Sequence, residues 1–405
     1  MVKGMYTSLT TVHGIQCWGA HTGVKSKRRD LALIYSEEPA SAAAVFTRNL
    51  VRAEPIKISQ EHIKNGKAQA FVINSGNANA CTGEQGRKGA QKMASQAAQS
   101  MKIPEEDVII SSTGVIGRQF PTEKILKGIR ENVRKLSKRD VAGSFVSNAI
   151  LTTDTFPKEG ATDFTIGRKN VNLAGVAKGS GMIHPNMGTM LAFIVSDLAI
   201  SPHLADKALR EAVDLTFNMI SVDGDTSTND MVALMCNGRA ENSEITSEGP
   251  YYQKFKTELI QLCQYLSQAI VSDGEGATKF IEYHIKNAPT VEDARKVART
   301  ISDSKLVKTA FFGRDPNWGR IVAAAGRAGV NYNPDKIDLS IGTNKMIPVI
   351  KDGNPDNNVL TRLKKMLKAS SVKVEMDLKA GDAEATAWGT DLSYEYVRIN
   401  AAYTS

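Results

Sequence analysis

One stretch of the sequence, residues 178–194 (KGSGMIHPNMGTMLAFI), constrains the fold more than any other. It leads into the apolar run Met190 to Val195, which predicts a buried strand directly after Gly188 and Thr189. A threonine at the start of such a strand has a chemical use, because its Oγ can attack the preceding carbonyl where glycine adds no Cβ. Hydrolysis of the ester leaves Thr189 as a new N-terminus, whose α-amino group (ordinary pKa ~7.7–8.0) is a base beside its own hydroxyl. The same pattern is also typical of an ordinary turn before a strand.

The composition is that of a globular protein with room for a large core. At 405 residues the chain is long enough for two or three domains, and 41% of its residues are hydrophobic. The formal net charge is +8, but its densest basic clusters, residues 25–29 (KSKRR) and 134–139 (RKLSKR), are short and lack interleaved aromatic residues. We therefore expect solvated basic faces and no nucleic-acid partner, with a mildly positive field that attracts anionic substrates.

The cysteines and the N-terminus indicate where the protein works. Four cysteines lie far apart in the sequence without CxxC spacing, which predicts free thiols in a reducing compartment. The six histidines form no i,i+4 pair, so no metal site is expected. The first residues contain no apolar signal segment, and no apolar run approaches membrane-spanning length. The sequence predicts a cytoplasmic protein without a membrane partner.

Strands and helices alternate along the chain in similar numbers, without regular βαβ spacing. This pattern indicates an α+β layered fold whose domains pack closely, because no long Pro- or Gly-rich linker separates them. Strands are expected at residues 13–18, 31–35, 42–47, 70–73, 108–110, 190–195, 231–236 and 394–400, and helices at 87–101, from Pro121, from Ser201–Pro202 and along the apolar stripe from Phe255 to Ile270.

Several polar segments at strand ends could carry chemistry. Thr113 and Gly114 follow a predicted strand, where backbone N–H groups and a hydroxyl can face a developing oxyanion, although an ordinary strand-end turn has the same pattern. The loop 152–155 (TTDT) is dense in hydroxyls and is not expected in the core. Glu275 lies between two glycines, which suits a carboxylate held close to a ligand amine but also a common surface turn.

Seven motifs, read together, give a more specific indication. They are NSGNANACTG (74–83), STGVIG (112–117), TTDT (152–155), KGSGMIHPNMGTML (178–191), DGDTSTND (223–230), DPNWGR (315–320) and INAAYTS (399–405). In these motifs the chain resembles the ornithine acetyltransferase family, the two-chain glutamate N-acetyltransferases of arginine biosynthesis. The resemblance runs from the N-terminal strands to the final serine.

The resemblance implies a fold and an assembly. It implies an αββα layered sandwich of the self-cleaving N-terminal-nucleophile type, with a second, smaller lobe. Cleavage between Gly188 and Thr189 gives an alpha fragment (1–188) and a beta fragment (189–405) that fold together, usually as a heterotetramer with two copies of each. The family usually carries alanine at the position of Gly188; a glycine there relaxes the strain that drives cleavage but unblocks the attack, and we expect cleavage.

The resemblance also implies a ping-pong reaction, in which acetyl passes from N-acetylornithine to Thr189 and then to glutamate. Some members also accept acetyl-CoA as donor, which the sequence leaves open here, and no other cofactor is expected. Thr113 and Gly114 match the oxyanion hole, and Glu275 matches a binder of substrate amino groups. Further implied substrate contacts are Thr152 (favoured over Thr153), Lys178, Thr189, Asn400 and Ser405.

Two other classes of protein stay open. An N-terminal-nucleophile amidase or peptidase would use water where the acetyltransferase uses glutamate. A non-catalytic basic binding protein would remain one uncut chain. The segment DPNWGR has no assignable chemistry and is expected to be structural or pocket-shaping.

Overall fold

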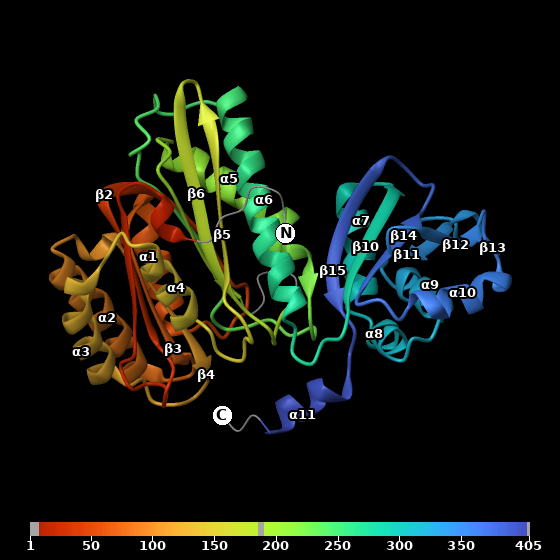
Figure 1. Ribbon diagram of the computed structural model, residues 1–405, viewed down its shortest axis with the longest axis horizontal. Coiled ribbons are helices and arrows are strands. Elements are labelled where there is room, and N and C mark those ends of the chain that lie inside the picture. The colour runs from red at the N-terminus through yellow and green to blue at the C-terminus, as the bar shows by residue number, and fades with distance from the viewer. Residues whose placement is uncertain (1–7, 185–189, 403–405) are drawn as a thin grey trace.

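The computed structural model describes residues 8–184 and 190–402 of the chain. The predicted cleavage pair, Gly188 and Thr189, and the C-terminal Ser405 lie outside the described residues. Two lobes are visible in Figure 1, a larger one built around the first sheet and a smaller one built around the second.

Within the described residues, the larger lobe contains an eight-stranded mixed sheet. Its strand order is β4-β3-β2-β9-β7-β6-β5, and β1 pairs with β2 beside this path. The strands are β1 (Ile15–Ala20), β2 (Leu31–Phe46), β3 (Lys67–Asn77), β4 (Val108–Val115), β5 (Lys158–Ile166), β6 (Lys169–Lys178), β7 (Leu191–Ser196) and β9 (Met231–Cys236).

Strand β2 belongs to both halves of this sheet. Its first half pairs with β1 and β3, and its second half pairs with β9, with an irregular register between Tyr35 and Ala40. The prediction of two separate strands at 31–35 and 42–47 was therefore wrong. The polar residues and Pro39 between them mark the place where β2 changes partners, not the end of the strand.

The sheet folds back on itself into a sandwich. The rings of Phe71 on β3 and Phe193 on β7 lie 5.4 Å apart, although β2 and β9 separate these strands in the sheet. Neighbouring strands of a sheet are ~4.8 Å apart, so two strands that far along a flat sheet could not bring their rings together. The inner faces of the two halves therefore pack against each other in a shared core.

Alternate residues of the central strands bury opposite faces of the sheet. Phe193 points into the inner core, whereas its neighbours Ala192 and Ile194 pack in the outer core with α5 and α6. On the other half, Val72 packs in the outer core with α2 and α3. Helix layers thus cover both outer faces (Figure 1), which confirms the predicted αββα sandwich. The helices of this lobe are α1 (Glu54–His62), α2 (Gly83–Met101), α3 (Thr122–Asn132), α4 (Asp140–Ala149), α5 (Pro202–Leu215) and α6 (Pro250–Ser272).

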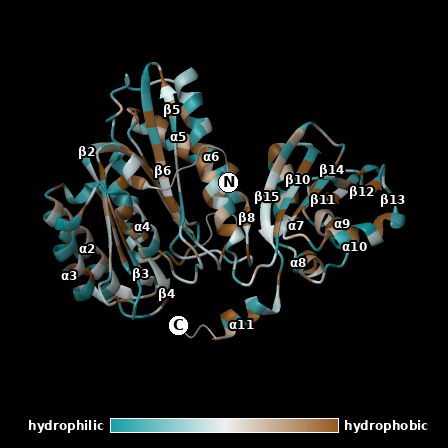
Figure 2. Ribbon diagram, viewed as in Figure 1, coloured by the Kyte–Doolittle hydropathy of each residue, from teal (hydrophilic) through white to brown (hydrophobic). Residues whose placement is uncertain are grey.

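The second lobe is a smaller layered unit. Its sheet has the order β13-β12-β11-β14-β10-β15-β8, and its apolar residues join the same continuous core as α5 and α6, so the two lobes pack directly on each other. Figure 2 shows apolar residues along its strands. Its elements are β8 (Ile220–Ser221), β10 (Phe280–Ala288), α7 (Val291–Ser302), α8 (Lys305–Phe312), α9 (Trp318–Gly326), β11 (Asp338–Gly342), β12 (Met346–Lys351), β13 (Asn354–Pro355), α10 (Leu360–Met366), β14 (Ser371–Asp377) and β15 (Ala383–Thr390).

The C-terminal segment is a helix, α11 (Tyr394–Ala402), where the sequence predicted a strand. Its tyrosines, Val397 and Ile399 favour a strand, but the segment has left the sheet at the end of β15 and finds no strand partner. Two of its side-chain contacts are local: Arg398 pairs with Glu395, and Asn400 Nδ2 donates to the carbonyl of Tyr396 (3.0 Å). Helix α11 runs from the end of the second lobe back towards the larger one (Figure 1).

The cysteines and the helices bear on two further predictions from the sequence. All four cysteines are free thiols, as predicted, and Cys17, Cys236 and Cys263 are buried. None of the helices in the described ranges combines the length and the apolar character needed to cross a membrane.

Candidate active site

A polar cavity of about 150 Å³ lies where strands β4 and β6 end. Its lining residues are far apart in the sequence: they lie at the ends of β4 and β6, in the segments before β5 and β9, after α6, and on α11. Six predicted site residues line it: Thr113, Gly114, Thr152, Lys178, Glu275 and Asn400. The other lining residues are Ile116, Thr153, Gly181, Met182, Ser227, Thr228 and Asn229.

The Thr113–Gly114 pair closes the end of β4, which runs parallel to β3. Gly114 has φ +134°, and a Cβ at this position would lie 2.5 Å from the carbonyl carbon of Gly76. Only glycine fits this close approach of two backbones. Because Gly114 has no side chain, its backbone can lie against that of Gly76 at the edge of the cavity.

Lys178 lies at the end of β6 and is the buried cation of the cavity, with 3% of its surface exposed. Its Nζ donates to Thr152 Oγ1 (2.8 Å) and, at 3.4 Å, to Thr113 Oγ1. Burial lowers the pKa of Lys178, and the Asp154 carboxylate, 4.0 Å from Nζ, opposes this effect. One ammonium group thus links the predicted oxyanion segment to the predicted substrate loop.

The loop 152–155 is held by its own aspartate. Asp154 is 3% exposed, and it accepts hydrogen bonds from the N–H groups of Thr152 (2.9 Å) and Gly179 (2.7 Å). The expectation that this loop stays out of the core is therefore wrong for Asp154. Thr152 Oγ1 bonds Lys178, whereas Thr153 Oγ1 lies 2.8 Å from Ser180 Oγ, so the two threonine hydroxyls have different partners.

Glu275 comes to the cavity from the turn after α6. Its N–H donates to the carbonyl of Ser180 (2.8 Å), and its Oε2 accepts from Asn400 Nδ2 (2.8 Å). Gly181 lies against the carboxylate, where an added Cβ would be 2.4 Å from Glu275 Oε2. Asn400 on α11 and Glu275 therefore form one wall of the cavity.

Sequence reasoning missed a buried carboxylate that bonds the residue after the predicted nucleophile. Asp230 is 1% exposed, and its Oδ1 accepts from the N–H of Met190 (2.8 Å), the residue after Thr189. Burial raises the pKa of Asp230 well above its ordinary value. The signal that could have found Asp230 is an acidic residue directly before a fully apolar strand, β9. Sequence reasoning also missed the buried ion pairs of Lys158 with Asp154 and Asp273.

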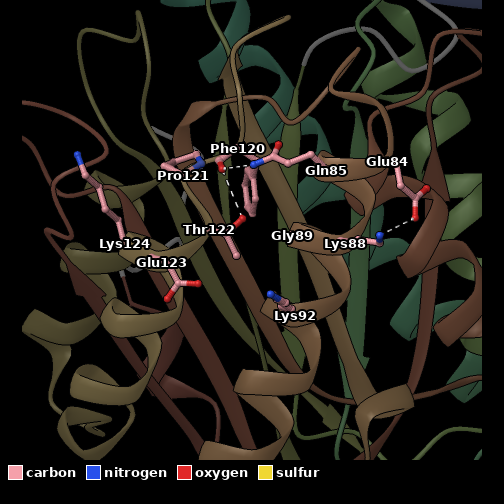
Figure 3. Close-up of a pocket in the computed structure, with 10 residues that line it drawn as sticks. All are labelled: Glu84, Gln85, Lys88, Gly89, Lys92, Phe120, Pro121, Thr122, Glu123 and Lys124. Carbon is pink, nitrogen blue, oxygen red and sulfur yellow. Dashed lines mark hydrogen bonds and ion pairs between the residues drawn. The ribbon is translucent and has the colours of Figure 1, made fainter.

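Other polar groups lie elsewhere. A larger cavity of about 710 Å³ lies between α2 and α3 and includes the Lys88–Glu84 ion pair, but none of the predicted site residues line it (Figure 3). The DPNWGR segment lies at the start of α9 in the second lobe and lines a separate small cavity. Within residues 8–184 and 190–402, no group of three or more His, Cys, Asp or Glu side chains is placed to hold a metal ion.

The fold and the cavity define a class: a layered α+β protein with a buried lysine, hydroxyls and a carboxylate around one polar cavity. Comparisons identify the family. The model of the ArgJ family matches residues 16–405. The arginine biosynthesis bifunctional protein ArgJ of Caldanaerobacter subterraneus is 48% identical over 392 residues, covering 96% of each chain. That of Listeria monocytogenes is 46% identical over 404 residues, covering 100% of this chain and 99% of its own.

The chain belongs to the ArgJ family, which confirms the resemblance found in its motifs and makes it an acyltransferase of arginine biosynthesis. A solved structure, that of the arginine biosynthesis bifunctional protein ArgJ of Bacillus halodurans, is 45% identical. It matches with a TM-score of 0.43 over 45% of this chain and 97% of its own.

Proposed function

We propose that this protein cuts itself between Gly188 and Thr189 and then moves an acetyl group from N-acetylornithine to glutamate. The acetyl group is carried on the hydroxyl of Thr189. The products are ornithine and N-acetylglutamate, and acetyl-CoA serves as a second donor in the same site.

One observation carries the proposal most directly. Six residues that the sequence assigned to the reaction line one cavity, although they come from positions 113 to 400. The strand that follows Thr189 is anchored in the same region, because the N–H of Met190 donates to Asp230 Oδ1 (2.8 Å). A nucleophile at position 189 is covalently attached to that anchored residue.

The mechanism assigns a role to each group. The freed amine of Thr189 accepts the proton of its own hydroxyl, whose Oγ forms a bond to the acetyl carbonyl of N-acetylornithine. Thr113 and the N–H of Gly114 donate to the oxyanion of the tetrahedral intermediate. The C–N bond of the amide then breaks, the leaving amine of ornithine takes the proton, and an acetyl ester remains on Thr189.

The second half of the reaction uses the same groups in reverse. The amine of glutamate attacks the ester, and Oγ of Thr189 leaves with a proton. Both substrates carry an α-carboxylate beside the nitrogen that reacts, and Lys178, Thr152, the Glu275 carboxylate, Asn400 and Ser405 bind their polar groups. Lys178 is suited to a carboxylate because it is buried and charged, and Glu275 is suited to an ammonium group.

We further propose that the working enzyme contains two copies of each fragment and acts in the cytoplasm. Four free cysteines suit a reducing compartment.

The test is a labelling experiment with purified protein. N-acetylornithine carrying an isotopic label in its acetyl group is added alone, and the protein is digested and examined by mass spectrometry. We expect one labelled peptide, which begins with Thr189, and transfer of the label to N-acetylglutamate when glutamate is added. Acetyl-CoA with the same label tests the second donor.

The control is Thr189→Ala, which lacks the hydroxyl and should take up no label. Release of labelled acetate at the same rate with and without glutamate would instead identify an amidase. Transfer to glutamate without any labelled threonine would contradict the acetyl-threonine intermediate.

A further inference from the structure

Four buried charged side chains form a network behind the cavity. Asp154, Lys158, Lys178 and Asp273 are each exposed to 5% or less. Lys158 Nζ donates to Asp154 Oδ1 (2.8 Å) and to Asp273 Oδ2 (2.5 Å). Asp154 Oδ2 lies 4.0 Å from Lys178 Nζ. Of these four, Lys178 lines the cavity, so any effect of the other three on a substrate has to pass through neighbouring residues.

The two carboxylates hold different parts of the cavity wall. Asp154 accepts hydrogen bonds from the N–H groups of Thr152 and Gly179. Thr152 is the hydrogen-bond partner of Lys178, and Gly179 is the residue after Lys178. Asp273 accepts from the N–H (3.0 Å) and the hydroxyl of Thr155, and it lies two residues before Glu275. Lys158 is the only group among the described residues that bonds both carboxylates.

The charges of this network balance, with two ammonium groups and two carboxylates. Burying them costs desolvation energy that apolar side chains of the same size would not cost. The positive neighbours dominate at Asp154: although burial alone would raise its pKa, Lys178 and Lys158 lower it below the ordinary value. The Asp154 carboxylate therefore favours the charged form of Lys178, against the effect of burial.

We propose that Asp154 and Lys158 are positioning residues for the transfer reaction. Asp154 fixes the ammonium of Lys178 against Thr152 and Thr113, and Lys158 ties this group to Asp273 and so to the turn that carries Glu275. The two substrate-binding charges, one positive and one negative, are thereby held at a set separation. This inference rests on the proposed function, because it requires that Lys178 and Glu275 bind substrate.

The alkaline pH dependence follows from the groups that face Lys178. Burial lowers its pKa, and the carboxylates Asp154, Asp230 and Glu275 oppose this, while Lys158 adds to it. Lys25 also lies close enough to interact with Lys178. Removing the charge of Asp154 should lower the pKa of Lys178 further, so the cation is lost at lower pH.

The experiment compares Asp154→Asn and Lys158→Met with the wild-type enzyme in steady-state assays across pH. We expect Asp154→Asn to raise KM for both N-acetylornithine and glutamate by about tenfold or more, with a smaller fall in kcat. The alkaline limb of its kcat/KM profile should move to lower pH. Lys158→Met should raise both KM values while Asp154 continues to hold Lys178. The matched control is Lys279→Met, another buried lysine, whose Nζ donates to the carbonyls of Leu367 and Ala369.

A double variant, Asp154→Asn with Lys158→Met, separates positioning from folding. It removes one charge of each sign, which a buried pair often tolerates better than loss of one partner. We expect it to recover the Tm lost in the single variants but to keep the raised KM and the shifted alkaline limb. Recovery of wild-type kinetics and pH profile together with Tm would overturn the proposal. So would wild-type kinetics of Asp154→Asn in an enzyme that Lys178→Met inactivates. Failure of the proposed function itself is distinct, because wild-type protein would then transfer no acetyl group.

Discussion

At Thr113 the direction of one hydrogen bond decides whether the hydroxyl can take its proposed role in the oxyanion hole. Thr113 Oγ1 accepts a hydrogen bond from Lys178 (3.4 Å), and a hydroxyl that accepts in this way keeps its own proton free to donate. In the cavity this proton can face the oxyanion. The Lys178 cation also strengthens the hydroxyl as a donor, since it withdraws electron density from the oxygen.

We therefore expect Thr113→Ala to lower kcat by about 10²–10³, the usual loss for one oxyanion donor. Thr113→Ser keeps the hydroxyl and should retain most of the activity. The measurement is kcat at saturating N-acetylornithine and glutamate. A change below tenfold in the alanine variant would remove Thr113 from this role.

At the level of single residues, the sequence predicts cavity residues that lie in distinctive motifs. It misses residues whose importance shows only in their contacts in the folded protein. Thr113, Thr152, Lys178, Glu275 and Asn400 could be selected because each lies in a segment with a distinctive string of residues. The buried pairs of Lys158 could not be selected. A lysine at the start of a strand is ordinarily solvated, and no periodicity shows that residue 273 lies against residue 158.

At the scale of elements, helix α11 connects the second lobe to the cavity. Asn400 Nδ2 donates to Glu275 Oε2 (2.8 Å), and the hydroxyl of Tyr396 donates to Asp223 (3.3 Å). Gly276 lies beneath the helix, where an added Cβ would be 2.4 Å from the N–H nitrogen of Tyr396. These contacts tie an otherwise exposed helix to the turn that carries Glu275.

Deleting Ala401 to Ser405 should raise KM for N-acetylornithine and glutamate alike, because both carry an α-carboxylate beside the reacting nitrogen and are proposed to bind against this wall. Self-cleavage should be unchanged, since its chemistry is local to Gly188 and Thr189. Fragment formation and steady-state kinetics are measured on one preparation. Asn400→Asp is the companion variant: it places a second carboxylate beside Glu275 and should also raise KM. Wild-type KM values in both variants would contradict a role for α11 in binding.

Helices and strands were predicted correctly where the local pattern of apolar residues matches the burial of the whole segment. The apolar stripe from Phe255 to Ile270 is buried along α6, and the predicted strand 231–236 is β9. The predictions failed where tertiary partners decide. Strand β2 continues through Pro39 because β9 takes over from β1, and α11 is helical because no sheet edge receives it. Neither partner can be read from the local sequence.

At the scale of the whole molecule, the predicted cut falls in the sequence between β6 and β7, two strands that pair in one sheet. Strand β7 pairs with β6 on one side and with β9 on the other, and β9 also pairs with β2. The predicted fragments, 1–188 and 189–405, would therefore share one sheet and one core.

We expect purified protein to give two bands on a denaturing gel, the second beginning with Thr189, and one species under native conditions. Thr189→Ala should give a single inactive chain of the same native fold. N-terminal sequencing and native mass spectrometry make the comparison. An intact chain with full activity would contradict self-cleavage, and fragments that separate without denaturant would contradict the shared sheet.

The pairing of β7 between strands of both fragments has a consequence for the lifetime of the enzyme. An uncut chain refolds by a unimolecular reaction, whereas two pieces that have come apart must find each other by collision, with unpaired strand edges exposed meanwhile. Dilution of the protein therefore slows the reassembly of separated fragments. A chain cut as proposed would thus be preserved by the height of its unfolding barrier, not by a reversible balance between folded and unfolded states.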